Sequence, residues 1–157
     1  MKLSAAESAQ TEMDFAEISF REDLIGNESP LPEDEIADAC DHDLVVSKLA
    51  VHLQRQKIKI GNDTESELFA VDVSGNRISH IFEIVADAKE KNVMAAAGRL
   101  LMQTSAAAVN PQPVAVLPLD IKETYAEELY RINISVIGFH WQEDKIIFSG
   151  LERIKFA

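Results

Sequence analysis

The most restrictive feature of the sequence is the run Pro-Val-Ala-Val-Leu at residues 113–117, which contains no polar side chain. A strand of this composition is typical of a sheet that is buried on both faces, because a strand with one face in water alternates apolar and polar residues. Helices must then cover both faces, and helical patterns stand before and after the run. We therefore expect an α/β fold in which helices flank a central sheet.

The remaining elements follow from hydrophobic periodicity and turn residues. Apolar side chains recur every three or four residues up to about residue 56, which predicts a helix that starts near Glu33 or restarts at Asp41. Ser-Gly-Asn at 74–76 joins two β-rich runs as a hairpin, so the sheet should be mixed. The other expected elements are strands over about 57–60, 67–73, 77–86, 113–117 and 132–139, helices over about 90–106 and 124–130, and one or two edge strands within 145–156.

Acidic residues are concentrated at the start of the chain. The whole chain has a net charge of -12, and residues 1–41 contain 12 of its 27 acids but only two bases. Residues 42–157 are nearly neutral, with 15 acids and 13 bases. We therefore expect an acidic N-terminal arm over residues 1–31, followed by a single domain over residues 32–157. The overall charge argues against a general affinity for nucleic acid, which depends on Lys and Arg.

Cysteine content and hydropathy predict the cellular setting. Cys40 is the only cysteine, so the chain has no internal disulfide, and no apolar run is long enough to span a bilayer. We expect a cytoplasmic protein without a membrane partner. The apolar residues at 146–148 and 154–156 could pair between the edges of two sheets, which favours a homodimer.

Two acids lie on the expected hairpin. Asp72 stands near the end of its first strand and Glu83 on its second, so the two side chains could meet on neighbouring strands. An acid in an apolar strand is costly unless it is hydrogen-bonded, paired or bound to a cation, and carboxylate oxygens favour Mg²⁺ or Mn²⁺. Alternatively, both acids point outward into water and have no special role.

The order of these elements and acids from Asp43 to Leu117 resembles the PD-(D/E)XK nuclease superfamily. The resemblance implies a restriction-endonuclease-like αβββαβ core, here with an extra C-terminal helix and strands. It also implies that Asp72 and Glu83 are the metal ligands and catalytic acids, with a further acid from the first helix, for which Asp41 or Asp43 is the candidate. The segment AAAGRLLMQ is similar to the Ala-x-Gly-Gln-Leu helix of many such nucleases, with Arg99 where Gln is common.

One departure from the family pattern bears on activity. Position 85 is Val, where the Glu-x-Lys motif of the family has the lysine that stabilises charge or positions water. Lys89, at the turn after the strand, and Arg99, on the following helix, are the candidates to replace this lysine. Both could also be ordinary solvated charges.

Three functions remain open at this point. The first is a degenerate nuclease-fold protein that does not cleave and has a binding or regulatory role, with a protein or nucleic acid as partner. The second is an active Mg²⁺-dependent DNA endonuclease in which Lys89 or Arg99 replaces the missing lysine. The third is an immunity or inhibitor type of protein that presents its acidic arm to a basic partner.

Overall fold

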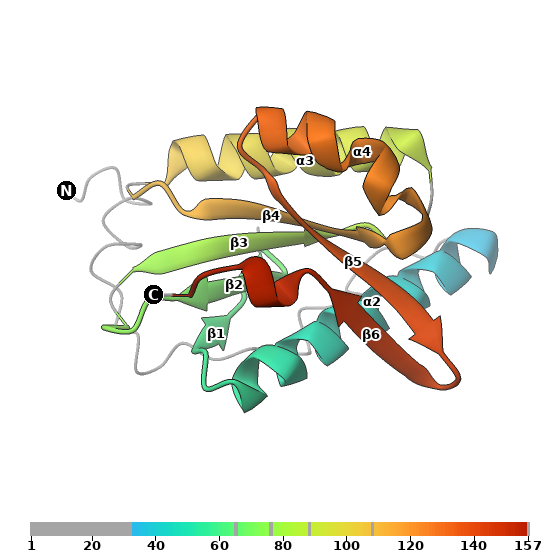
Figure 1. Cartoon of the computed structure of the whole chain (residues 1–157), viewed down its shortest axis with the longest axis horizontal. Coiled ribbons are helices and arrows are strands. Elements are labelled where there is room, and N and C mark those ends of the chain that lie inside the picture. Colours follow the sequence, from blue (N-terminus) through green and yellow to red (C-terminus); the bar gives the residue numbers. More distant parts are fainter. Residues whose placement is uncertain (1–32, 65, 76, 88, 108, 157) are drawn as a thin grey trace.

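The computed structural model of the chain is shown in Figure 1. It describes residues 33–156 except residues 65, 76, 88 and 108. The acidic arm expected at residues 1–31 lies outside the described residues, so that expectation stays a prediction.

A six-stranded sheet forms the middle layer, and its strands lie side by side in sequence order from β1 to β6. The two central pairs, β3–β4 and β4–β5, are parallel, whereas the other three pairs are antiparallel. The elements are α2 (Glu33–Arg55), β1 (Ile60–Gly61), β2 (Leu68–Val71), β3 (Ile78–Ile84), α3 (Glu90–Ala106), β4 (Gln112–Pro118), α4 (Leu119–Arg131), β5 (Ser135–Gln142), β6 (Lys145–Ser149) and the 3-10 helix η2 (Leu151–Arg153).

Helices cover both faces of this sheet. Figure 1 shows α2 on one face and α3 with α4 on the other. In β4, Val114 and Val116 belong to the core under α2, and Ala115 and Leu117 belong to the core under α3 and α4. The apolar run is therefore buried on both faces, and the expected α/β class with a mixed central sheet between helices is confirmed. The order αβββαβ followed by a helix and strands also agrees with the expectation.

The structure corrects several element boundaries. The helix expected at 124–130 begins at Leu119, because Pro118 ends β4 and directly serves as the N-cap. The strand expected at 132–139 begins only at Ser135, because the backbone N–H of Ile132 still bonds to the end of α4 and Asn133 has a φ of 65°. The first strand pairs only at Ile60–Gly61.

The C-terminal apolar residues pack within the chain itself. Ile146 and Phe148 of β6, which is an edge strand, and Ile154 and Phe156 after it are partly buried against the core under α2. Pairing between two chains at this edge stays a prediction. Among the helices that the structure describes, none is both long enough and apolar enough to cross a lipid bilayer.

Adjacent leucines on α3 provide a test of this layer arrangement. The Leu100 side chain is 0% exposed in the core under α3, whereas that of Leu101 is 40% exposed. Leu100→Ala should lower the free energy of unfolding by about 2 to 5 kcal/mol, because it leaves a cavity in a packed core. Leu101→Ala is the matched control and should cost less than about 1 kcal/mol. Urea unfolding measures both, and equal losses would contradict this orientation of α3.

Candidate functional site

The register of the β2–β3 hairpin determines which acids meet. Leu68 pairs with Phe82 in the last pair of the ladder, so Glu67, one residue before β2, comes close to Glu83, one residue further along β3. Ile81 on β3 and Val85 just after it are two residues away from Glu83 on either side, so their side chains share its face of the sheet. Both belong to the core under α3. Glu83 therefore extends toward the α3 side of the sheet.

Asp72 lies far from Glu83, at the other end of the hairpin, beyond a shift in register between Ala70 and Val71. Val71 pairs with Ile78, and the backbone N–H of Asp72 donates to the carbonyl of Arg77, at the closed end of the hairpin. Glu83 lies five residues further along β3 than Ile78, which corresponds to roughly 16 Å of extended strand. The carboxylate of Asp72 accepts a hydrogen bond from the Ser74 hydroxyl at 2.7 Å. The expected convergence of Asp72 and Glu83 is therefore not what the hairpin produces.

Glu83 forms an ion pair with Arg99, across the interface between β3 and α3. The Arg99 Nε–H donates to Oε1 of Glu83 at 2.6 Å, with the Glu83 side chain 12% exposed and that of Arg99 54% exposed. Burial raises the pKa of the Glu83 carboxyl above its usual value, although the hydrogen bond and charge of Arg99 oppose that rise. The guanidinium of Arg99 thus stabilises the charged form of Glu83, which burial disfavours.

A second polar cluster lies on the α2 side. Nε2 of His42 lies 2.8 Å from Oε2 of Glu67, and Nδ1 of His42 lies 3.3 Å from Oδ1 of Asp43. Burial alone would lower the pKa of His42, but its contacts with these two carboxylates raise it above its usual value. The contact of His42 with Glu67 is the shorter of the two and contributes both a hydrogen bond and an opposite charge to the raised pKa.

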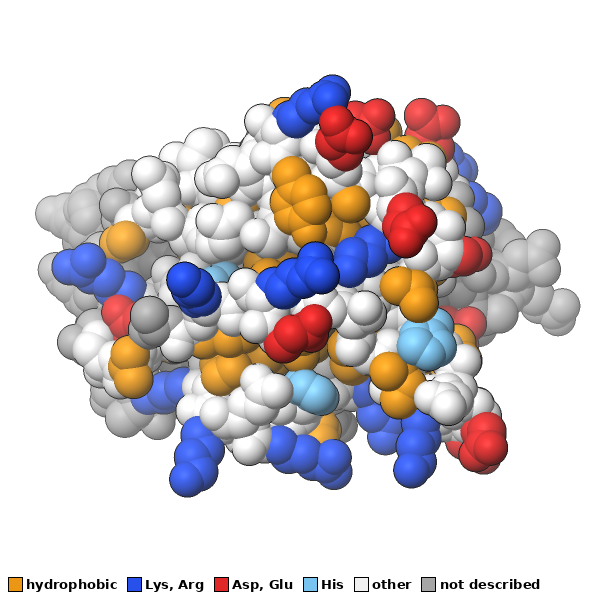
Figure 2. All heavy atoms as spheres, in the orientation of Figure 1, with side chains coloured by type: hydrophobic (Ala, Val, Ile, Leu, Met, Phe, Trp, Pro, Cys, Tyr) orange, Lys and Arg blue, Asp and Glu red, His pale blue; other side chains and the backbone are white. Residues whose placement is uncertain are grey.

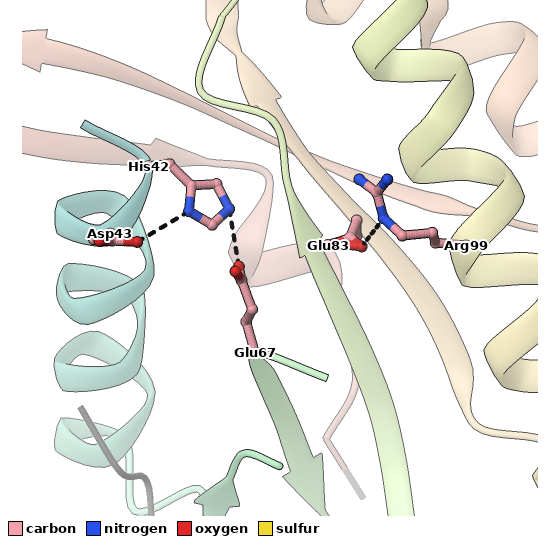
Figure 3. Close-up of polar contacts among 5 residues, drawn as sticks. All are labelled: His42, Asp43, Glu67, Glu83 and Arg99. Carbon is pink, nitrogen blue, oxygen red and sulfur yellow. Dashed lines mark hydrogen bonds and ion pairs between the residues drawn. The ribbon is translucent and has the colours of Figure 1, made fainter. Parts of the chain in front are cut away.

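The two clusters form one electrostatic site at the end of the sheet. Figure 3 shows His42 and Asp43 on α2, Glu67 before β2, Glu83 on β3 and Arg99 on α3. The charge of Glu67 raises the pKa of Glu83, and the charge of His42 lowers it, so the groups interact across the strand. A cavity of about 240 Å³ lies beside them and is lined by residues that include His42, Val85, Asp87, Asn92 and Arg99.

The expected replacements for the family lysine differ in their placement. Val85 is buried and lines the cavity. Arg99 reaches Glu83, as described above. Lys89 is the N-cap residue of α3, and its Nζ lies 3.9 Å from Oδ2 of Asp87. Asp87 also accepts hydrogen bonds from the Asn92 amide at 3.0 and 2.8 Å, so the turn before α3 is an internally bonded unit.

The donor groups of the site do not fit a divalent metal ion as they stand. Oε1 of Glu83 faces the guanidinium of Arg99, and Oε2 of Glu67 faces the imidazole of His42. Mg²⁺ requires several oxygen ligands in near-octahedral geometry, so an ion would have to displace these cations. In the part of the chain that the structure describes, no three His, Cys, Asp or Glu side chains are grouped to hold a metal.

Sequence reasoning missed two members of the site. Glu67 stands immediately before the apolar run Leu-Phe-Ala-Val, and counting the ladder back from the Ser-Gly-Asn turn would have paired it with Glu83. His42 carries no such signal, because its role depends on where α2 crosses the sheet. Asp43, a candidate acid of the first helix, does lie in this site as a partner of His42.

Comparisons of the chain with protein-family models, with curated proteins and with solved structures found no match.

The Glu83–Arg99 pair gives a prediction for stability. Arg99→Met should lower the free energy of unfolding at neutral pH by about 1 to 3 kcal/mol, because Glu83 loses its charged hydrogen-bond partner in a buried position. The double variant with Glu83→Gln should lose less than the sum of the two single losses. Urea unfolding of all four proteins measures the coupling.

An ion pair on the protein surface serves as the control for the comparison of single and double variants. Arg131 and Glu127 also approach to 2.6 Å, but both side chains are more than two-thirds exposed, at 71% and 76%. Arg131→Met should therefore cost about 0.5 kcal/mol or less. Equal losses from Arg99→Met and Arg131→Met would contradict a larger contribution from the pair that contains the mostly buried Glu83.

Two histidines should titrate in opposite directions from the ordinary value of 6.5. The pKa of His42 is raised, so its contribution to stability is present below pH 6.5 and is lost as the pH rises through its folded pKa. Burial lowers the pKa of His80 to about 4, so His80 instead reduces stability as the pH falls from 6.5 toward 4. NMR titration of the imidazole signals measures both values, and Glu67→Gln should lower only that of His42. A His42 value below 6.5 would contradict the cluster.

Proposed function

We propose that this chain is a degenerate PD-(D/E)XK-like nuclease-fold protein that does not cleave nucleic acid and has a binding or regulatory role. The observation that carries the proposal is the side chain of Arg99, which donates to Glu83 at 2.6 Å in the position where the family has a metal-binding acid. The observed order of helices and strands is the order that the resemblance implies, which supports the same proposal.

Charge arrangement explains why cleavage is not expected. Metal-dependent hydrolysis needs carboxylates that hold the ion and a positioned charged group that stabilises the transition state. Here Arg99 supplies an internal cation to Glu83, and the buried Val85 offers neither a charge nor a hydrogen bond at the lysine position. Loss of one such donor typically reduces the rate on the order of a hundredfold or more.

The endonuclease alternative has one specific observation in its favour. Arg99 is already beside Glu83, so it could act as the relocated basic residue if Mg²⁺ or Mn²⁺ displaced it from the carboxylate. The inhibitor-type alternative depends on the acidic arm, which lies outside the described residues.

In the view of Figure 2, Lys and Arg side chains are spread along the lower edge, over α2 and β1, which suits an anionic partner.

The first experiment measures metal binding and cleavage together. We expect no saturable calorimetric heat when Mg²⁺ or Mn²⁺ is added to the wild-type protein, and no cleavage of DNA or RNA above a Glu83→Ala control. This outcome is expected because Arg99 competes with the ion for Glu83. Arg99→Gln, which removes the competing charge, should bind the metal more tightly than the wild type.

Two results would contradict the proposal. Saturable metal binding with cleavage that disappears in both Glu83→Ala and Arg99→Gln would establish the endonuclease alternative, with Arg99 as the basic residue. Metal binding that is unaffected by Glu83→Ala would place the ion elsewhere and remove the link to this site.

A further inference from the structure

A larger cavity lies at the carboxyl ends of the parallel strands, next to the acidic site. It has a volume of about 590 Å³, and Ala86 lines both this cavity and the smaller one. Its walls come from α2, the ends of β4 and β5 and the first turn of α4. Figure 1 shows these strand ends together at one side of the sheet. Pockets at the carboxyl ends of parallel strands are common ligand sites in α/β proteins, and this volume lies in the range of small-molecule pockets.

Aromatic and acidic side chains dominate the lining. Phe139 and Trp141, on one face of β5, and His140, on the other, line the cavity at the end of the strand, and Asp41 and Asp120 contribute carboxylates from α2 and α4. Trp141 is 44% exposed, although a large aromatic side chain of this kind is usually more buried. None of the described residues that line the cavity is a Lys or an Arg. Such walls attract a cation and repel an anion.

His140, which also lines the cavity, has a ring nitrogen without a hydrogen-bond partner among the described residues. Its Nδ1 is shielded from solvent and has no hydrogen-bond partner among the described residues, which is an unfavourable state for a buried polar atom. No hydrogen bond therefore fixes the ring through this nitrogen. Rotation of the ring would allow Nδ1 to accept a hydrogen bond from an N–H group of a ligand in the cavity.

We propose that this cavity is a binding site for a small, flat organic cation that carries N–H groups, such as an aromatic amidine or guanidine. The aromatic walls would contact the flat face of the ligand, and cations bind favourably over such rings. Asp41 and Asp120 would supply the opposite charge, and His140 would accept an N–H. The proposal does not depend on the nuclease resemblance: of the lining residues only Asp41 is also a candidate acid of that resemblance, and the aromatic residues, Asp120 and His140 have no part in it.

The only tryptophan of the chain lines this cavity, so its fluorescence reports on the site directly. Three probes of nearly equal shape separate charge from fit: benzamidine is cationic, benzamide is neutral and benzoate is anionic. We expect benzamidine to change the Trp141 fluorescence saturably and to bind at least about fivefold more tightly than benzamide. Benzoate should bind more weakly than either.

Single substitutions then locate the charge. Asp120→Asn should weaken benzamidine and leave benzamide unchanged, and the matched control Asp144→Asn, in the turn between β5 and β6, should affect neither. His140→Phe keeps a ring but removes the acceptor, so it should weaken both benzamidine and benzamide. The proposal would be overturned by a fluorescence response that does not saturate with any probe. Benzoate binding as tightly as benzamidine, or equal effects of Asp120→Asn and Asp144→Asn, would overturn it as well.

Discussion

A mostly buried carboxylate on a strand that is covered on both faces needs a countercharge from a neighbouring element, and Glu83, with its side chain 12% exposed, is in this position. The sheet cannot expose β3, because β2 and β4 flank it and helices lie over both of its faces. Arg99 meets the requirement from α3, with its Nε 2.6 Å from Oε1 of Glu83. The ion pair therefore links the charge balance of the site to α3, which the buried Val93, Ala96, Ala97 and Leu100 hold over the sheet.

The acidic end of the hairpin is neutralised in the same way. The charge of Glu67 raises the pKa of the nearby Glu83, and two like charges this close are destabilising unless each has a partner. His42 supplies that partner from α2, on the other side of the sheet. Each of the two flanking layers thus contributes one cation to one acid. An arrangement of this kind stabilises the fold by internal pairing and leaves the carboxylates little freedom to hold an ion.

The general architecture could be predicted from the sequence because it depends on local patterns. The apolar run at 113–117 required cover on both faces, and the periodicity of α2 and α3 supplied it. The site was predicted only in part. Glu83 and Arg99 were identified, but Asp72 was paired with Glu83 without counting residues back from the Ser-Gly-Asn turn, and the register decides every cross-strand partner. His42 depends on tertiary packing, for which the sequence contains no local signal.

The most direct test of this account is the NMR signal of the Arg99 Nε–H group, followed in isotope-labelled protein as Mn²⁺ is added. The account predicts a hydrogen-bonded Nε proton that shifts when Glu83→Gln is introduced, and that keeps its position and width as the paramagnetic ion is titrated. Selective broadening of the Glu83 and Arg99 signals, with release of the Nε proton into rapid exchange with water, would show that a metal takes the carboxylate from Arg99. That result would contradict the central claim.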